Sequence, residues 1–204
     1  MIHVGISGPI GAGKSTLAQQ LSDFFPSAII PFAYGVKQIA ALELQDNRLQ
    51  AITDMLVSYG AIYTHAYIAA SMIDGYMTKY PSTPGVKNRR LLQFIGAEAG
   101  RQTIHPDLWI AVVQQQMIPL QNHATVIFSD DLRFNNEADT VDIHVGILEN
   151  QCYNTRVQNF TPQYLFSDHE SEQSLTRIPD IVIPACWSNQ ALQNLVDLIT
   201  VSLD

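Results

Sequence analysis

Residues 8–15 read GPIGAGKS, which fits the pattern GxxxxGK[ST]. The octet follows an apolar run predicted to be a strand (2–7) and opens a helical pattern predicted to run over 13–25. Its glycines allow the backbone to turn successive N–H groups toward one point, where the amino terminus of the helix adds positive potential. The stretch is therefore predicted to be a phosphate-binding loop.

The polar side chains of this loop have distinct expected roles on a nucleoside triphosphate. Lys14 is expected to bridge the β- and γ-phosphate oxygens, the Ser15 hydroxyl to ligate a magnesium ion, and Thr16 to support the α-phosphate. The alternative is a chance glycine turn, which the flanking strand and helix disfavour. The residues expected to bind the triphosphate are Gly8, Gly11, Ala12, Gly13, Lys14, Ser15 and Thr16.

Apolar runs alternate with helical periodicity along the chain, which is typical of a parallel sheet covered by helices on both faces. We expect one α/β domain over 1–204 with a three-layer arrangement, a helical region over about 35–120 and a polar, aperiodic lid over 149–168. Further strands are predicted over 27–33, 124–129, 142–148 and 180–183, and helices over 36–60, 63–80, 89–104, 107–120, 135–141 and 189–203.

Composition limits the partners. The 204 residues carry a formal net charge of −8, so the chain as a whole repels a phosphate backbone or an anionic membrane, and we expect neither nucleic acid nor membrane as a partner. No apolar run approaches the length of a membrane span, and Cys152 and Cys186 are interpreted as free thiols of a reducing compartment. These observations predict a soluble, cytoplasmic protein; a homodimer is left open.

A cationic segment lies in the middle of the chain. Over 89–101, RRLLQFIGAEAGR, helical spacing allows Arg90, Gln93 and Arg101 to share one face, which would offer two guanidinium groups and an amide to a ligand with a phosphate and a base. The alternative is a set of solvated arginines that pair with Glu98 and nearby acids.

Acidic residues follow the predicted strand 124–129, in the stretch SDDLRFNNE over 129–137. A carboxylate at the carboxyl end of a buried strand beside a phosphate loop is placed to hold magnesium or to orient an acceptor. Arg133 would neutralise charge on the transferring group. The alternative is a capped helix start with Asp131 as the N-cap residue.

Taken together, these blocks resemble the deoxynucleoside monophosphate kinases of tailed bacteriophages, a branch of the P-loop nucleoside monophosphate kinase fold. The matching blocks are GPIGAGKST (8–16), FAYGVK (32–37), RRLLQFIGAEAGRQTIHPDLWI (89–110), VIFSDDLRFNNEAD (126–139) and DHESE (168–172). The resemblance implies transfer of the γ-phosphoryl group of ATP, with Mg²⁺, to a deoxynucleoside 5′-monophosphate.

The same resemblance implies roles for residues outside the phosphate loop. It assigns Phe32, Lys37, Arg89, Arg90, Gln93, Arg101 and Glu137 to the acceptor nucleotide. It assigns Asp131 and Arg133 to the transfer site with Lys14, and Asp131 to the metal with Ser15; Arg156 in the lid is the expected further cation. Trp109 is interpreted as a packing residue rather than a stacking partner for a base.

The sequence departs from the family pattern at two places, and two other functions are alternatives to the one that the resemblance implies. The last predicted strand runs into Pro-Ala-Cys-Trp (184–187) instead of an Asn-containing turn near the adenine, and residue 149 is Glu where a basic residue is expected. One rival is a kinase of another small metabolite, such as dephospho-coenzyme A. The other is a nucleotide-binding module without transfer.

Overall fold

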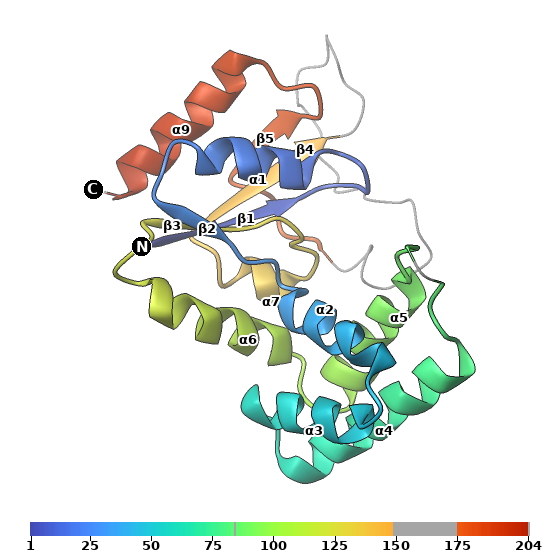
Figure 1. Cartoon of the computed structure of the whole chain (residues 1–204). Helices are drawn as coiled ribbons and strands as arrows, with labels where there is room; N and C mark the ends of the chain where they lie inside the picture. Colours follow the sequence, from blue (N-terminus) through green and yellow to red (C-terminus); the bar gives the residue numbers. More distant parts are fainter. Residues whose placement is uncertain (84, 149–174, 204) are drawn as a thin grey trace. The chain divides into compact units, whose positions relative to one another are not determined.

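The computed structural model describes residues 1–83, 85–148 and 175–203 (Figure 1). The chain forms two compact units. The first consists of Met1–Pro31 and Met117–Asp204, and the second is the continuous stretch Phe32–Gln116. The ends of the chain thus build one unit, and the middle of the chain builds the other.

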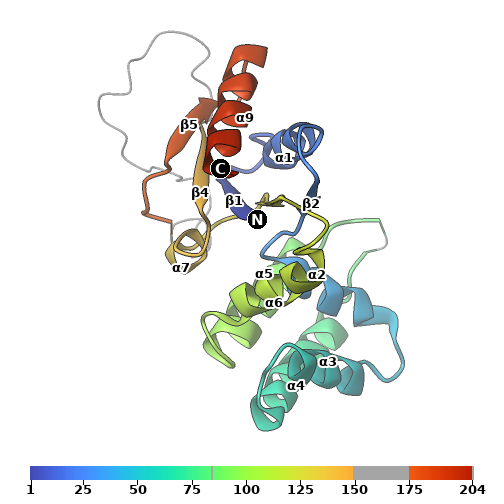
Figure 2. The same cartoon turned by 90° about the vertical axis from the view of Figure 1, so that its left-hand side faces the viewer.

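The first unit is built on a five-stranded parallel sheet with the order β2-β3-β1-β4-β5. The strands are β1 (Ile2–Ser7), β2 (Ser27–Ile29), β3 (Val126–Ser129), β4 (Ile143–Leu148) and β5 (Ile181–Pro184). Helices α1 (Lys14–Ser22) and α9 (Asn189–Leu203) lie on one face and α7 (Asn135–Ala138) on the other, as Figures 1 and 2 show. The predicted α/β class with a parallel sheet is confirmed.

One face of this sheet is apolar because alternate strand residues point to the same side. Val4 and Ile6 of β1 are fully buried and pack with Leu17 and Leu21 of α1 and with Leu195 of α9. This packing fixes α1 against β1, and so fixes the turn between them, where the phosphate loop lies.

The opposite face carries two buried histidines. The Nε2 atom of His3 lies 2.8 Å from the Ser129 hydroxyl, and Nε2 of His144 lies 2.7 Å from the hydroxyl of Ser7. Burial lowers the pKa of both imidazoles to about 4 and outweighs the nearby carboxylates of Asp142 and Asp180, which raise it. Both rings are therefore neutral in the folded protein at neutral pH.

Stability should fall as the pH is lowered from about 6.5 toward 4. Over this window the unfolded chain binds protons at both histidines and the folded chain does not, so acid favours unfolding by up to about 1.4 kcal/mol per pH unit for each histidine. Urea unfolding at pH 7 and pH 5 measures this loss. His144→Asn should flatten the dependence by about one proton, and equal stability of the wild type at both pH values would contradict the prediction.

The second unit is helical. It contains α2 (Tyr34–Ala40), a 3₁₀ turn over Ala41–Leu44, α3 (Arg48–Ser58), α4 (Tyr63–Lys79), α5 (Arg89–Phe94), a π-helix over Ile95–Gln102 and most of α6 (Leu108–Met117). Helices α3 and α4 pack against each other, and a 3₁₀ turn over Ile118–Leu120 follows α6. The lower part of Figure 2 shows these helices.

Trp109 organises the core of the second unit. Its side chain is only 2% exposed, and its Nε1 donates to the Gly96 carbonyl at 2.8 Å. The indole also lies against Gly35 and Gly100, where a side chain would overlap it. The interpretation of Trp109 as a packing residue is confirmed.

Gly100→Ala should destabilise the second unit by about 1–3 kcal/mol, the usual cost of overpacking. The added methyl group would overlap the Trp109 indole and approach the Ile95 carbonyl oxygen to 2.9 Å. Gly75→Ala in α4 is the matched control, because no atom lies within 4 Å of its added Cβ and the helix should gain up to about 1 kcal/mol. Urea unfolding midpoints compare the two, and equal midpoints would contradict this packing.

The single helix predicted over 89–104 is wrong in its second half. The chain is α-helical to Phe94 and then forms a π-helix over Ile95–Gln102. A π-helix closes hydrogen bonds between residues five apart, so side chains stack at spacings of four to five rather than three to four. Spacing that assumes a regular α-helix therefore misplaces Arg101 relative to Arg90.

The cysteines and the predicted lid both lie in the part of the first unit that follows β4. Cys186, just after β5, is disulfide-bonded, so the predicted free thiol is wrong there and its support for a reducing compartment is lost; Cys152 lies outside the described residues. The predicted lid over 149–168, including Arg156, also lies outside them. Within the described ranges, no helix is both long enough and apolar enough to cross a membrane.

Candidate functional site

The phosphate loop connects β1 to α1 in the first unit. Gly13 is the N-cap residue of α1 with φ 89°, in the left-handed region that favours glycine. Its carbonyl accepts the N–H of Leu17 at 2.8 Å, and Gly8 and Gly11 also have positive φ. The loop therefore leads directly into the positive end of α1, where backbone N–H groups can bind an anion.

Lys14 folds back over this loop. Its Nζ donates to the carbonyl oxygens of Gly8 and Pro9, each at 2.7 Å. The ammonium group is thus held at the mouth of the loop by neutral acceptors, which a phosphate oxygen can replace with a stronger, charge-assisted bond. This geometry fits the predicted role of Lys14.

Ser15 is paired with a carboxylate from the neighbouring strand. Its hydroxyl donates a short hydrogen bond to Oδ2 of Asp130, the first residue after β3. The register explains the contact, because β1 pairs with β3 up to Gly5 and Ser129, so both chains leave the sheet at the same edge. Asp130 belongs to the acidic cluster that follows the predicted strand, but the family resemblance assigns the metal to Asp131.

Glu137 has a local role in the loop that follows β3. Its side chain is buried, and its Oε2 accepts the N–H groups of Arg133 at 2.8 Å and Phe134 at 3.1 Å. Helix α7 begins at Asn135 with Phe134 as the N-cap residue, so the alternative of Asp131 as N-cap is wrong. Asp131 and Arg133 are half-buried in this loop, and their roles in transfer stay predictions.

Trp187 lies beside the phosphate loop, although the sequence pattern gives this residue no role in binding the triphosphate. Its indole would meet a Cβ on Gly13 at 2.9 Å, and its Nε1 donates to Oε1 of Gln20 on α1 at 2.9 Å. The segment after β5 therefore places an aromatic ring along the start of α1. The sequence signal for this contact is the Pro-Ala-Cys-Trp stretch (184–187), which stands where the family has an Asn-containing turn near the adenine.

The residues assigned to the acceptor lie in the second unit, except Glu137, which lies in the first. Arg89 and Arg90 are exposed at the start of α5, whereas Arg101 is half-buried and its Nη1 donates to the Pro106 carbonyl at 2.6 Å. Phe32 is buried, with 2% of its surface exposed. Lys37 of α2 is exposed and Gln93 of α5 is half-buried.

A known protein is similar to nearly the whole of this chain. The chain is similar to the deoxynucleoside-5′-monophosphate kinase of Escherichia phage T5, with 24% identity over 245 aligned positions that cover 96% of this chain and 90% of the relative. No family model matches the sequence. The similarity thus extends over both units.

The donor set beside the phosphate loop fits magnesium. A hydroxyl and a carboxylate, Ser15 and Asp130, lie in direct contact there. In the described ranges, no group of three or more His, Cys, Asp or Glu side chains is placed to hold a metal ion. Mg²⁺ commonly takes only one or two protein oxygens and completes its coordination with water and substrate phosphates, so two oxygen donors suit it.

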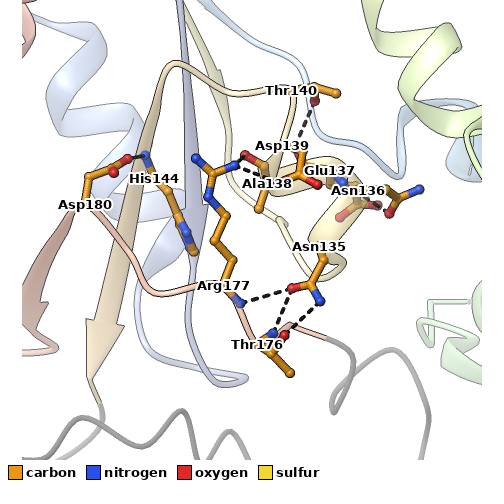
Figure 3. A network of polar contacts seen from close by, with 10 residues as sticks. All are labelled: Asn135, Asn136, Glu137, Ala138, Asp139, Thr140, His144, Thr176, Arg177 and Asp180. Atoms are coloured by element: carbon orange, nitrogen blue, oxygen red, sulfur yellow. Dashed lines mark hydrogen bonds and ion pairs between the residues drawn. The ribbon is translucent and has the colours of Figure 1, made fainter.

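A polar network fixes α7 to the chain that enters β5 (Figure 3). Oδ1 of Asn135 accepts the backbone N–H groups of Thr176 at 2.8 Å and Arg177 at 3.0 Å. The guanidinium of Arg177 donates to the Ala138 carbonyl and to Asp139. The network therefore holds the helix that follows the Asp130–Arg133 loop.

Proposed function

We propose that this chain is an ATP-dependent kinase that transfers the γ-phosphoryl group of ATP to a deoxynucleoside 5′-monophosphate. The observation that carries the proposal is the contact between Ser15 in the phosphate loop and Asp130 after the adjacent strand, beside a lysine held over the loop. The full-length similarity to a deoxynucleoside-5′-monophosphate kinase supports the choice of acceptor.

The donor site would act by binding and charge. Backbone N–H groups at the start of α1 hold the phosphate oxygens, and Lys14 moves from the Gly8 and Pro9 carbonyls to the β- and γ-phosphates. Ser15 and Asp130 hold Mg²⁺, which when bound neutralises charge on the phosphates. Trp187, against Gly13, supplies an aromatic surface for the nucleoside part of the donor.

The acceptor would be held by the second unit. Arg90 and Lys37 are exposed cations suited to its phosphate, and the Gln93 amide is suited to its base. An acceptor phosphate oxygen is already ionised at pH 7, so the reaction needs no strong general base. Asp131 and Arg133 would then orient the reactants and neutralise charge.

An acceptor panel tests the proposal. The purified chain is incubated with ATP, Mg²⁺ and each common deoxynucleoside or ribonucleoside monophosphate, or dephospho-coenzyme A, and ADP release and product are measured. We expect a deoxynucleoside diphosphate as product. Transfer to dephospho-coenzyme A alone would identify the rival kinase, and ATP binding without product would identify a binding module.

Arg90→Ala should raise KM for the monophosphate about tenfold or more, because one charge-assisted contact is lost, and leave KM for ATP nearly unchanged. Steady-state kinetics with each substrate varied in turn measure both constants. Lys79→Ala removes another cation at the end of α4 and serves as the control. A rise in KM for ATP alone would move Arg90 out of the acceptor site.

A further inference from the structure

The π-helix over Ile95–Gln102 contains an unusual carboxylate. Oε2 of Glu98 is buried and has no hydrogen-bond partner among the described residues. A buried carboxylate oxygen without a donor costs free energy, and such atoms are rare in folded proteins. The π-helix is rare as well, and the π-bulges that interrupt α-helices are frequent at functional sites.

The period of the π-helix also determines which side chains share one side of the helix with Glu98. With side chains stacked at spacings of four to five, Glu98 lies one turn beyond Gln93 and Phe94 and about two turns beyond Arg90. A regular α-helix would instead bring Arg101 more directly above Arg90 than Glu98. The side of the helix that carries the proposed acceptor contacts therefore includes Glu98.

We propose that Glu98 binds an uncharged hydrogen-bond donor on the nucleoside part of the acceptor, either a sugar hydroxyl or a base N–H group. This inference rests on the proposed function. A carboxylate repels a phosphate, so Glu98 faces the nucleoside end of the ligand while Arg90 faces the phosphate end. Eight residues of helix span at most about 12 Å, a length comparable with a nucleoside monophosphate.

The surroundings of Glu98 suit a nucleoside. Phe94, four residues earlier, is half-buried and stacks on Tyr76 with ring centroids 4.4 Å apart. Phe94 thus gives the same side of the helix an aromatic surface on which a base or sugar can pack. A ligand N–H or O–H would give Oε2 the partner that it lacks in the free protein.

Glu98→Gln and Glu98→Leu test this inference through binding and stability together. Calorimetric binding of the deoxynucleoside monophosphates without ATP should weaken roughly tenfold to a hundredfold, the cost of losing a hydrogen bond to a charged group. Thermal unfolding of the ligand-free variants should occur at the same or a higher temperature, because a buried carboxylate oxygen without a hydrogen-bond donor is removed. A merely structural glutamate would instead lower the unfolding temperature and leave the affinity unchanged.

Glu43→Gln is the matched control, because the Oε1 of Glu43 in the same unit already accepts the N–H of Ser82 at 2.7 Å. It should leave the affinity for every monophosphate unchanged. A weakening by Glu43→Gln equal to that of Glu98→Gln would overturn the inference.

Two series of ligands distinguish whether the sugar hydroxyl or a base N–H group donates the hydrogen bond to Glu98. If Glu98 binds the sugar hydroxyl, Glu98→Gln weakens binding of all four bases equally and adds no further loss with a 2′,3′-dideoxynucleoside monophosphate. If it binds the base, the loss is confined to the bases that present an amino or imino N–H at that point.

The outcomes separate this inference from the proposed function. A wild type that binds monophosphates but transfers nothing refutes the kinase, while Glu98 is still judged by binding. A wild type that transfers normally while both Glu98 variants bind as tightly as it does refutes the role of Glu98. A wild type that binds no monophosphate refutes both.

Discussion

Lys14→Ala should reduce phosphoryl transfer by roughly a thousandfold or more and leave the fold intact. The structure places the ammonium group directly on the phosphate loop, through the Gly8 and Pro9 carbonyls. Loss of a preorganised charge at the transferring group costs this order of rate. Single-turnover transfer with saturating ATP measures the effect.

The control for this variant is Lys87→Ala, which removes an exposed lysine in the second unit. Its rate should match that of the wild type. Because the Gly8 and Pro9 carbonyls that accept from Lys14 belong to the phosphate loop itself, the thermal unfolding temperature of Lys14→Ala should stay close to the wild-type value. Near-normal transfer by Lys14→Ala would refute the assignment of the donor site.

Asp130→Asn should lower transfer about a hundredfold and raise the magnesium concentration needed for half-maximal rate. The amide oxygen can still accept the Ser15 hydroxyl, so the loop geometry is preserved, but the negative charge that attracts the ion is gone. Titration of the rate with Mg²⁺ at fixed ATP separates a metal defect from a folding defect.

Asp131→Asn provides the comparison for this experiment. The family resemblance assigns the metal to Asp131, whereas the structure pairs Ser15 with Asp130. A shift in magnesium dependence for Asp130→Asn and not for Asp131→Asn is the expected result. The reverse pattern would return the metal to Asp131 and contradict the assignment made here.

The acceptor region shows how a correct sequence pattern can give an incomplete site. The cationic segment over 89–101 is helical as predicted, and Arg90 and Gln93 lie in its α-helical part. Its second half follows another period, and there Trp109 donates to the Gly96 carbonyl and its indole lies against Gly100. That packing partner lies outside the segment, so local periodicity contains no sign of it.

The sequence by itself determined the parallel α/β architecture and the phosphate loop, because glycine conformations, strand alternation and helix amino termini are set by neighbouring residues. Only the tertiary structure decided that Asp130 rather than Asp131 meets Ser15, a pairing between residues 115 positions apart. It likewise decided that Trp187 lies against Gly13 and that Glu98 stands in a π-helix. Contacts of this kind depend on strand order and packing, which join residues that no local pattern connects.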